Sequence, residues 1–61
     1  MALQLEVTIG GNNYAGVYEL LENILVVNYE DEVNRVPLND YVKNPQALAK
    51  TILRKMVLES T

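Results

Sequence analysis

An apolar residue occupies every second position from Leu3 to Ile9, and the residues between them are polar. This period of two is typical of a β-strand with one buried and one exposed face. Residues 10–13 then read Gly-Gly-Asn-Asn, and Gly and Asn readily adopt the positive φ of tight hairpin turns. A second strand-like segment, residues 14–20, follows at once. The pattern therefore predicts two antiparallel strands joined by a tight turn.

The same glycines raise the alternative of a phosphate-binding loop. Glycine loops that bind nucleotides run from a strand into a helix, whose N-terminus meets the phosphate. Here the loop is followed by Tyr-Ala-Gly-Val-Tyr, which favours a strand. We therefore interpret the glycines as a structural turn centred on Gly11-Asn12.

A competing helical pattern covers the middle of the chain. Apolar residues recur there at helical spacing, at Val17, Leu20, Leu21, Ile24 and Leu25. However, a glycine near the start of this stretch and the β-branched residues within 24–27 disfavour a helix. We predict strands at about residues 24–29 and 33–38 instead.

Loops with an even number of residues place one set of side chains from all four strands on the same face. That face collects Leu3, Leu5, Val7, Ile9, Tyr14, Gly16, Tyr18, Leu20, Leu25, Val27, Tyr29, Val36 and Leu38, with Asn34 as its polar member. With a second turn at Glu22-Asn23, we expect the ring of Tyr29 to cover Gly16. Pro37 falls in the last strand, which must be an edge because proline donates no ladder hydrogen bond.

The clearest helix signal covers residues 45–59. Asn44 is a favourable N-cap, and Pro45 suits the first helical position. The apolar residues behind them form one broad stripe, which consists of Leu48, Ala49, Ile52, Leu53, Met56 and Val57. The expected fold class is α+β, a single domain in which a four-stranded antiparallel meander carries a C-terminal helix on one face.

Three segments carry a resemblance to a known group, namely Gly11-x-x-Tyr14-x-Gly16-x-Tyr18, "ILVVNY" and "PQALAKTILRKMV". They resemble short, uncharacterised bacterial proteins in which a β-meander precedes a helix of the pattern Leu-Ala-x-x-Leu-Leu. Residues 22–27 of this chain, "ENILVV", stand where such proteins often have a glycine turn. The resemblance implies the meander-plus-helix fold, and it implies no activity.

The residue types that serve most enzyme mechanisms are scarce. The chain has no His and no Cys, and its only serine, Ser60, lies in a terminal segment that we expect to fray. No pair of carboxylates occupies apolar positions that would raise a pKa. Residues 30–32 are all acidic, but they lack the alternate spacing and the glycine of a calcium loop, so we interpret them as a solvated turn. We expect no enzyme activity, no cofactor and no metal.

No segment predicts export or membrane insertion. The longest apolar run, residues 24–27, is far shorter than the ~20 residues that a membrane span needs. The first residues lack the basic and apolar regions of a secretory signal. We therefore expect a cytoplasmic protein.

The charge of the chain changes sign along its length. Residues 1–40 carry seven acidic residues against one arginine, whereas residues 41–61 carry four basic residues against one acid. Lys50, Arg54 and Lys55 lie toward the C-terminal half of the predicted helix, where we expect positive charge to interact favourably with the helix dipole.

Nucleic-acid binding is the alternative function that this charge suggests. Its basic contacts would be Lys43, Lys50 and Arg54, along one side of the helix. Its stacking platform would consist of the tyrosines on the sheet, Tyr14, Tyr18 and Tyr29. We rank this alternative second, because the helix should cover those tyrosines and an acidic sheet repels phosphates.

One helix covers only one face of four strands. The opposite face collects the apolar residues of a candidate dimer or partner surface, which are Ala15, Val17, Leu21, Ile24, Val26 and Val33. A chain of 61 residues without disulfides buries little surface alone, so we expect a homodimer through this face. The rival geometry joins the edges of residues 3–9. The expected function is a non-catalytic interaction or accessory module whose protein partner the sequence leaves open.

Overall fold

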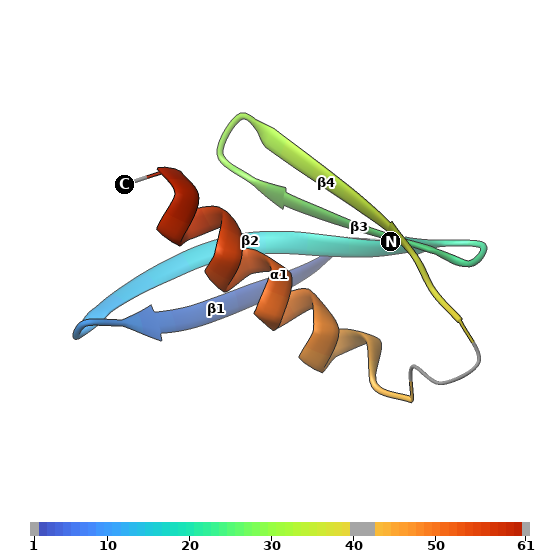
Figure 1. Ribbon diagram of the computed structural model, residues 1–61, viewed down its shortest axis with the longest axis horizontal. Helices are drawn as coiled ribbons and strands as arrows, with labels where there is room; N and C mark the ends of the chain where they lie inside the picture. The colour runs from blue at the N-terminus through green and yellow to red at the C-terminus, as the bar shows by residue number, and fades with distance from the viewer. Residues whose placement is uncertain (1, 40–42, 61) are drawn as a thin grey trace.

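The computed structural model describes residues 2–39 and 43–60. These residues form β1 (Leu3–Ile9), β2 (Asn12–Leu21), β3 (Ile24–Tyr29), β4 (Glu32–Pro37) and α1 (Pro45–Ser60). The strands make one antiparallel sheet in the order β1-β2-β3-β4, and α1 crosses one of its faces (Figure 1). The expected α+β fold, a meander followed by a helix, is confirmed.

A turn of two residues joins each pair of neighbouring strands, as the even-loop interpretation requires. Gly10 and Gly11 have φ values of 58° and 83°, which suit a primed hairpin turn, and β2 follows them directly. The turn therefore lies one residue earlier than the expected Gly11-Asn12. Across it, the Thr8 hydroxyl donates a hydrogen bond of 2.7 Å to Oδ1 of Asn13.

The middle of the chain forms strands, so the helical alternative is wrong. The pairing of Leu21 with Ile24 leaves Glu22 and Asn23 as the turn between β2 and β3. Leu38 lies just beyond β4, but its amide donates to the carbonyl of Asn23 at 2.7 Å and so continues the ladder. Pro37 ends β4 at the edge of the sheet, as predicted.

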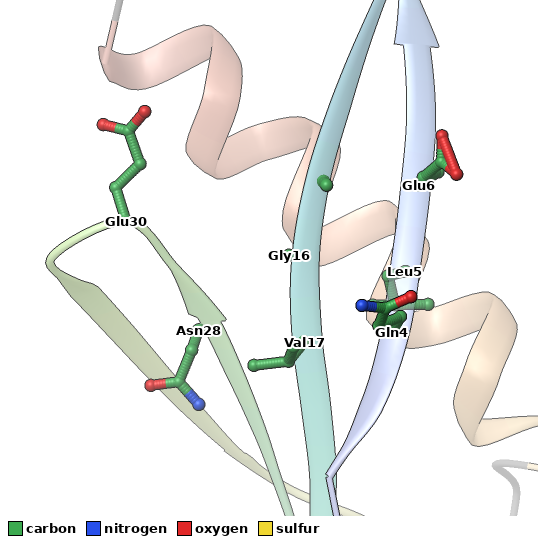
Figure 2. Close-up of a pocket in the computed structure, with 8 residues that line it drawn as sticks. Gln4, Leu5, Glu6, Gly16, Val17, Asn28 and Glu30 are labelled. Atoms are coloured by element: carbon green, nitrogen blue, oxygen red, sulfur yellow. The ribbon is translucent and has the colours of Figure 1, made fainter.

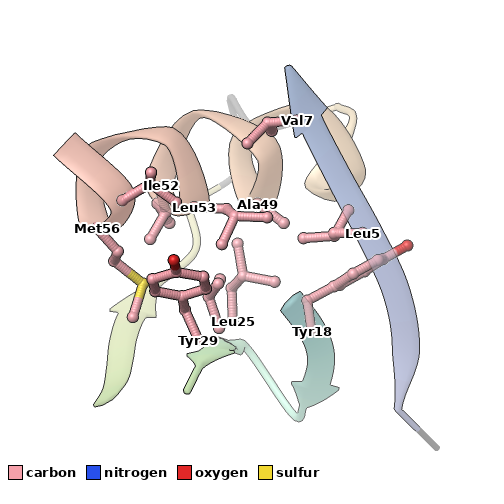
Figure 3. Close-up of a cluster of buried hydrophobic side chains, with 11 residues drawn as sticks. Leu5, Val7, Tyr18, Leu25, Tyr29, Ala49, Ile52, Leu53 and Met56 are labelled. Atoms are coloured by element: carbon pink, nitrogen blue, oxygen red, sulfur yellow. The ribbon is translucent and has the colours of Figure 1, made fainter. Parts of the chain in front are cut away.

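The core lies between α1 and the face of the sheet that α1 crosses (Figure 3). Its buried side chains are Leu5, Val7, Tyr18, Leu25, Val27, Tyr29, Ala49, Ile52, Leu53, Met56 and Val57. All of them belong to the strand face or the helix stripe predicted from the sequence. Leu3 and Leu20 share that strand face, but both remain 44% exposed beside the start of α1.

Gly16 allows the helix to approach the sheet closely. A Cβ atom at this position would lie 2.7 Å from the backbone oxygen of Asn28 and 3.0 Å from Cδ1 of Leu53. Leu53 of α1, rather than the expected ring of Tyr29, is therefore the side chain nearest to the bare glycine. The β2–β3 ladder ends at Val17 and Asn28, one residue before the level at which Gly16 would pair with that tyrosine.

The start of α1 agrees with the predicted cap. The Asn44 side chain accepts a hydrogen bond from the amide of Ala47 at 3.2 Å, and its carbonyl accepts from Leu48 at 3.3 Å. The expected interaction of basic residues with the helix dipole is wrong. The last turn of α1 contains no basic residue, because the helix continues for more than a turn beyond Lys55.

Candidate functional site

The face of the sheet opposite α1, here called the open face, has no covering layer among the described residues. The alternation of the strands places on it all six predicted interface residues, Ala15, Val17, Leu21, Ile24, Val26 and Val33. Figure 2 shows part of this face, with α1 on the far side of the sheet. The open face is therefore the surface to assess for a partner.

The register of the strands arranges the open face in rows that run across the sheet. The apolar row, beside the β2–β3 turn, consists of Leu21, Ile24 and Pro37. The charged row follows it and consists of Glu19, Val26 and Arg35. The mixed row comes next and consists of Gln4, Val17, Asn28 and Val33. Beyond it, Ala15 pairs with Glu6.

Apolar side chains on the open face are unevenly exposed. Leu21, Ile24 and Val33 are 52%, 41% and 48% exposed. Val26 is only 8% exposed, although no second layer covers it. Its neighbours on the two flanking strands are Glu19 and Arg35, whose long stems can shield an apolar residue between them. Val26 thus belongs to the predicted surface but is buried within the single chain.

Sequence reasoning missed one member of the surface. Pro37 marks an edge strand in the sequence, and in the structure it also pairs with Ile24 and extends the apolar row onto β4. The signal was available in the even-loop register, which places Pro37 on the same face as Ile24. The apolar row therefore spans β2, β3 and β4.

The open face has a shallow hollow of about 310 Å³ over β1 and β2. It forms where Ala15 and Gly16 place little side-chain volume beside longer neighbours. Gln4, Glu6, Asn28 and Glu30 are among its lining residues (Figure 2), which include no basic residue. Its carboxylates disfavour an anionic ligand, so the hollow does not revive the phosphate-binding alternative.

The acidic turn between β3 and β4 lies beside a buried tyrosine. Residues 30–32 are exposed, and they line a small depression together with Tyr29 and Ser60. Burial, and after it the charge of Glu30, raises the pKa of Tyr29 above its usual 10.0, while a hydrogen bond with Ser60 lowers it in part. Tyr29 therefore stays protonated at neutral pH as a core residue and offers no acid–base chemistry there.

The residues of the nucleic-acid alternative do not share one surface. Lys50 and Arg54 are exposed one turn apart on α1, and Lys43 is exposed just before the helix cap. The three tyrosines proposed for stacking lie under α1, two in the core and one packed against it, namely Tyr18, Tyr29 and Tyr14. The helix thus separates the basic side chains from the aromatic ones.

Neither a cluster of metal ligands nor a membrane-spanning helix occurs within residues 2–39 and 43–60. Across these residues, no three acidic side chains gather in an arrangement that could hold a metal ion. No helix within the same ranges has the length and apolar character needed to cross a membrane. The open face therefore remains the candidate site.

Comparison of the chain with protein-family models, with curated proteins and with solved structures finds no match. The resemblance to short bacterial proteins thus stands on the meander and the helix pattern alone.

Proposed function

We propose that this protein is a non-catalytic interaction module that acts as a homodimer, with the open face of the sheet as the contact between the two copies. The observation that carries the proposal is the difference in burial between the two faces of the sheet. α1 covers one face, whereas the other presents Leu21, Ile24 and Val33 to solvent. Removing such apolar surface from water is worth roughly 25 cal/mol per Å².

The pattern of β3 supports a second layer on the open face. Residues 24–27 are four consecutive apolar residues, so both sides of this strand are apolar. Strands with apolar residues on both sides are typical of sheets covered on both faces. Two copies stacked through their open faces would form a sandwich of two sheets with one helix on each outer side, the sheets lying about 10 Å apart.

The rival geometry joins two copies through β1. This strand is an edge of the sheet, and its sequence LQLEVTI contains no proline or lysine that would protect it from pairing. The opposite edge, β4, carries Arg35 and ends at Pro37. Open-face stacking and β1 pairing use different residues, so substitutions can separate them.

The test is the mass of the protein in solution, measured by light scattering coupled to gel filtration. We expect wild type at twice the chain mass of 6.9 kDa and a folded Ile24→Lys variant at the chain mass. Ile24 suits this test better than Val26, because it is already 41% exposed, so that we expect a lysine there to leave the single chain folded. Leu58→Lys is the matched control, since Leu58 is 56% exposed on α1, and this variant should remain dimeric.

Two outcomes would contradict the proposal. A wild-type monomer at ~100 μM, well above a micromolar dissociation constant, would exclude a functional homodimer. An Ile24→Lys variant that stays dimeric would exclude the open face as the contact. In that case, loss of the dimer in Glu6→Pro would identify the β1 edge, because proline there removes an amide donor from the edge strand.

The nucleic-acid alternative has its own test. Single-stranded RNA or DNA is titrated at ~150 mM salt, where only a site with several phosphate contacts retains affinity. We expect no sub-micromolar binding. Sub-micromolar binding that is lost in the Lys50→Glu, Arg54→Glu variant would make the outer side of α1 the functional surface.

The bacterial source and the cytoplasmic location expected from the sequence are part of the proposal. Fractionation of cells that express a tagged copy tests the location.

A further inference from the structure

The charged row of the open face has an acid at one end and a base at the other. Different arrangements of a dimer therefore bring either opposite or like charges together. Glu19 lies on β2, Val26 on β3 and Arg35 on β4, so an acid and a base flank one apolar residue at the same level of the sheet. The apolar row lies on one side of this level and the mixed row on the other. A face-to-face dimer brings each of these rows against a row of the second copy.

We propose that the two copies stack with their two-fold axis parallel to β3, so that Glu19 of each copy faces Arg35 of the other. The inference rests on the proposed homodimer and specifies its geometry. Rotation about an axis along β3 keeps every row at its own level but exchanges the β2 side with the β4 side. The acid of one copy then lies opposite the base of the second copy on both sides of Val26.

The same rotation matches the apolar row to itself. Ile24 lies on β3, near the axis, and therefore meets Ile24 of the other copy. Leu21 on β2 meets Pro37 on β4, and the reciprocal contact forms on the other side of the axis. Every residue of the apolar row thus meets an apolar partner, which includes the proline that sequence reasoning did not assign to the surface.

The β2, β3 and β4 residues of the mixed row are also self-complementary under this rotation, whereas Gln4 on β1 has no strand of the second copy opposite it. Val17 on β2 meets Val33 on β4, and Asn28 on β3 meets its own copy. Two side-chain amides can each donate to and accept from the other, so each Asn28 amide finds a partner across this contact. The three rows therefore agree on one axis.

The other two-fold axis in the plane of the interface runs across the strands along the charged row. It would place Glu19 against Glu19 and Arg35 against Arg35, and such like-charge contacts are strongly unfavourable at an interface. It would also place Ile24 over Asn28, an apolar residue over an amide. The charges and the apolar pattern both disfavour this arrangement.

The twist of the sheets does not remove the proposed contact. Aligned sheets pack at about 30° to each other. The charged side chains lie only one strand, about 4.8 Å, from the axis, so this angle displaces them by a few ångströms. That displacement is within reach of the flexible side chains of glutamate and arginine.

The experiment is charge complementation between Glu19→Arg and Arg35→Glu. Each variant alone places like charges across the interface, so we expect the dimer to weaken by at least about tenfold relative to wild type. In an equimolar mixture, the first variant presents two bases and the second two acids. Native mass spectrometry with one variant isotope-labelled should then show the heterodimer. The double variant Glu19→Arg, Arg35→Glu should regain the homodimer.

Several outcomes would overturn the axis. If both single variants dimerise as tightly as wild type, the charged row does not form the proposed contact, although the homodimer itself stands. If both are weakened and the mixture stays monomeric, the two charges act within one chain. A wild-type monomer would overturn the dimer and its axis together.

Circular dichroism establishes whether each variant is folded. If a charge-reversal variant is unfolded, the neutral variants Glu19→Gln and Arg35→Gln replace it. Those neutral variants should lose the salt sensitivity of the wild-type dimer, and an unchanged sensitivity would contradict the axis.

Discussion

At the scale of single residues, two turn positions hold a backbone that disfavours their side chains. Glu22 and Glu30 each stand first in a two-residue turn, with φ values of 58° and 53°. For a residue with a Cβ atom, left-handed backbone costs on the order of 1 kcal/mol, and Gly or Asn is the usual occupant of such turns. The second and third hairpins therefore form even though neither has Gly or Asn at its first turn position.

We predict that Glu30→Gly stabilises the fold, by up to ~1 kcal/mol, because glycine relieves the left-handed backbone. The measurement is the midpoint of urea unfolding at unchanged slope. Asp31→Gly is the matched control, since the neighbouring Asp31 has no positive φ and glycine there only adds freedom to the unfolded chain. A midpoint that falls in both variants would show that the backbone at Glu30 is not strained.

A second residue-scale prediction concerns Tyr29 and alkaline pH. Because burial and the charge of Glu30 raise its pKa above 10.0 in the folded state, folding favours the neutral phenol. Its contribution to stability is therefore complete below pH ~10 and is lost as the pH rises through the folded pKa. Tyr29→Phe should be less sensitive to pH over ~8 to ~11 than wild type, as measured by the free energy of unfolding. Equal losses in both proteins would contradict the shift.

At the scale of elements, α1 depends on how it starts and how closely it approaches the sheet. Asn44 caps the helix through its hydrogen bond to Ala47, and Gly16 leaves room for Leu53. The helix ends without a basic residue in its last turn. Its stability therefore comes from the cap and from packing on the sheet rather than from charges at its C-terminus.

We predict that Asn44→Ala lowers the free energy of unfolding by roughly 1 kcal/mol, the usual cost of removing an N-cap side chain. Asn44→Asp keeps a side-chain oxygen that can accept from the amide of Ala47, so it should stay close to wild type. Urea unfolding of the three proteins measures the difference. An unchanged midpoint in Asn44→Ala would place the start of the helix elsewhere.

The close approach at Gly16 predicts a second element-scale effect. Gly16→Ala would bring a methyl group within 2.7 Å of a backbone oxygen, so β2, β3 or α1 must shift. We expect a loss of about 1–3 kcal/mol in the free energy of unfolding, typical of an overpacked core. The combined variant Gly16→Ala, Leu53→Val is the control for the helix side, and thermal unfolding of both measures the cost. A Gly16→Ala variant as stable as wild type would contradict the close approach of Asn28 and Leu53 to this position.

At the scale of the whole molecule, the two faces of the sheet lie in different environments, because the single helix covers only one of them. The helix-covered face buries a complete core, whereas the open face mixes exposed apolar residues with charges. A second copy of the same chain would cover the open face, so no partner protein of another kind is needed. In the dimer proposed here, folding and association are coupled, so the stability of the chain depends on its concentration.

The whole-molecule prediction follows from this coupling. The midpoint of urea unfolding should rise when the protein concentration is raised, because mass action favours the folded dimer. Ile24→Lys should unfold at the same midpoint at every concentration. A wild-type midpoint that is independent of concentration would contradict the homodimer.

Local patterns were sufficient to predict the elements of this fold. The alternation of residues 3–9, the turn preferences of Gly and Asn, and the Asn44-Pro45 cap each act within a few neighbouring residues. The side-chain period of a strand is two, so even turns were enough to place all six predicted interface residues on one face. Short-range patterns in the sequence thus predict the meander, the helix and the residues of the open face.

The tertiary structure decided what depends on contacts between distant segments. Leu53 rather than Tyr29 lies nearest to Gly16, because the path of α1 over the sheet determines which side chain reaches the glycine. Val26 is buried on the open face, where Glu19 and Arg35 flank it on two other strands. The charged row exists only in the register of three strands. Such features combine residues far apart in the chain, and only their packing in three dimensions determines them.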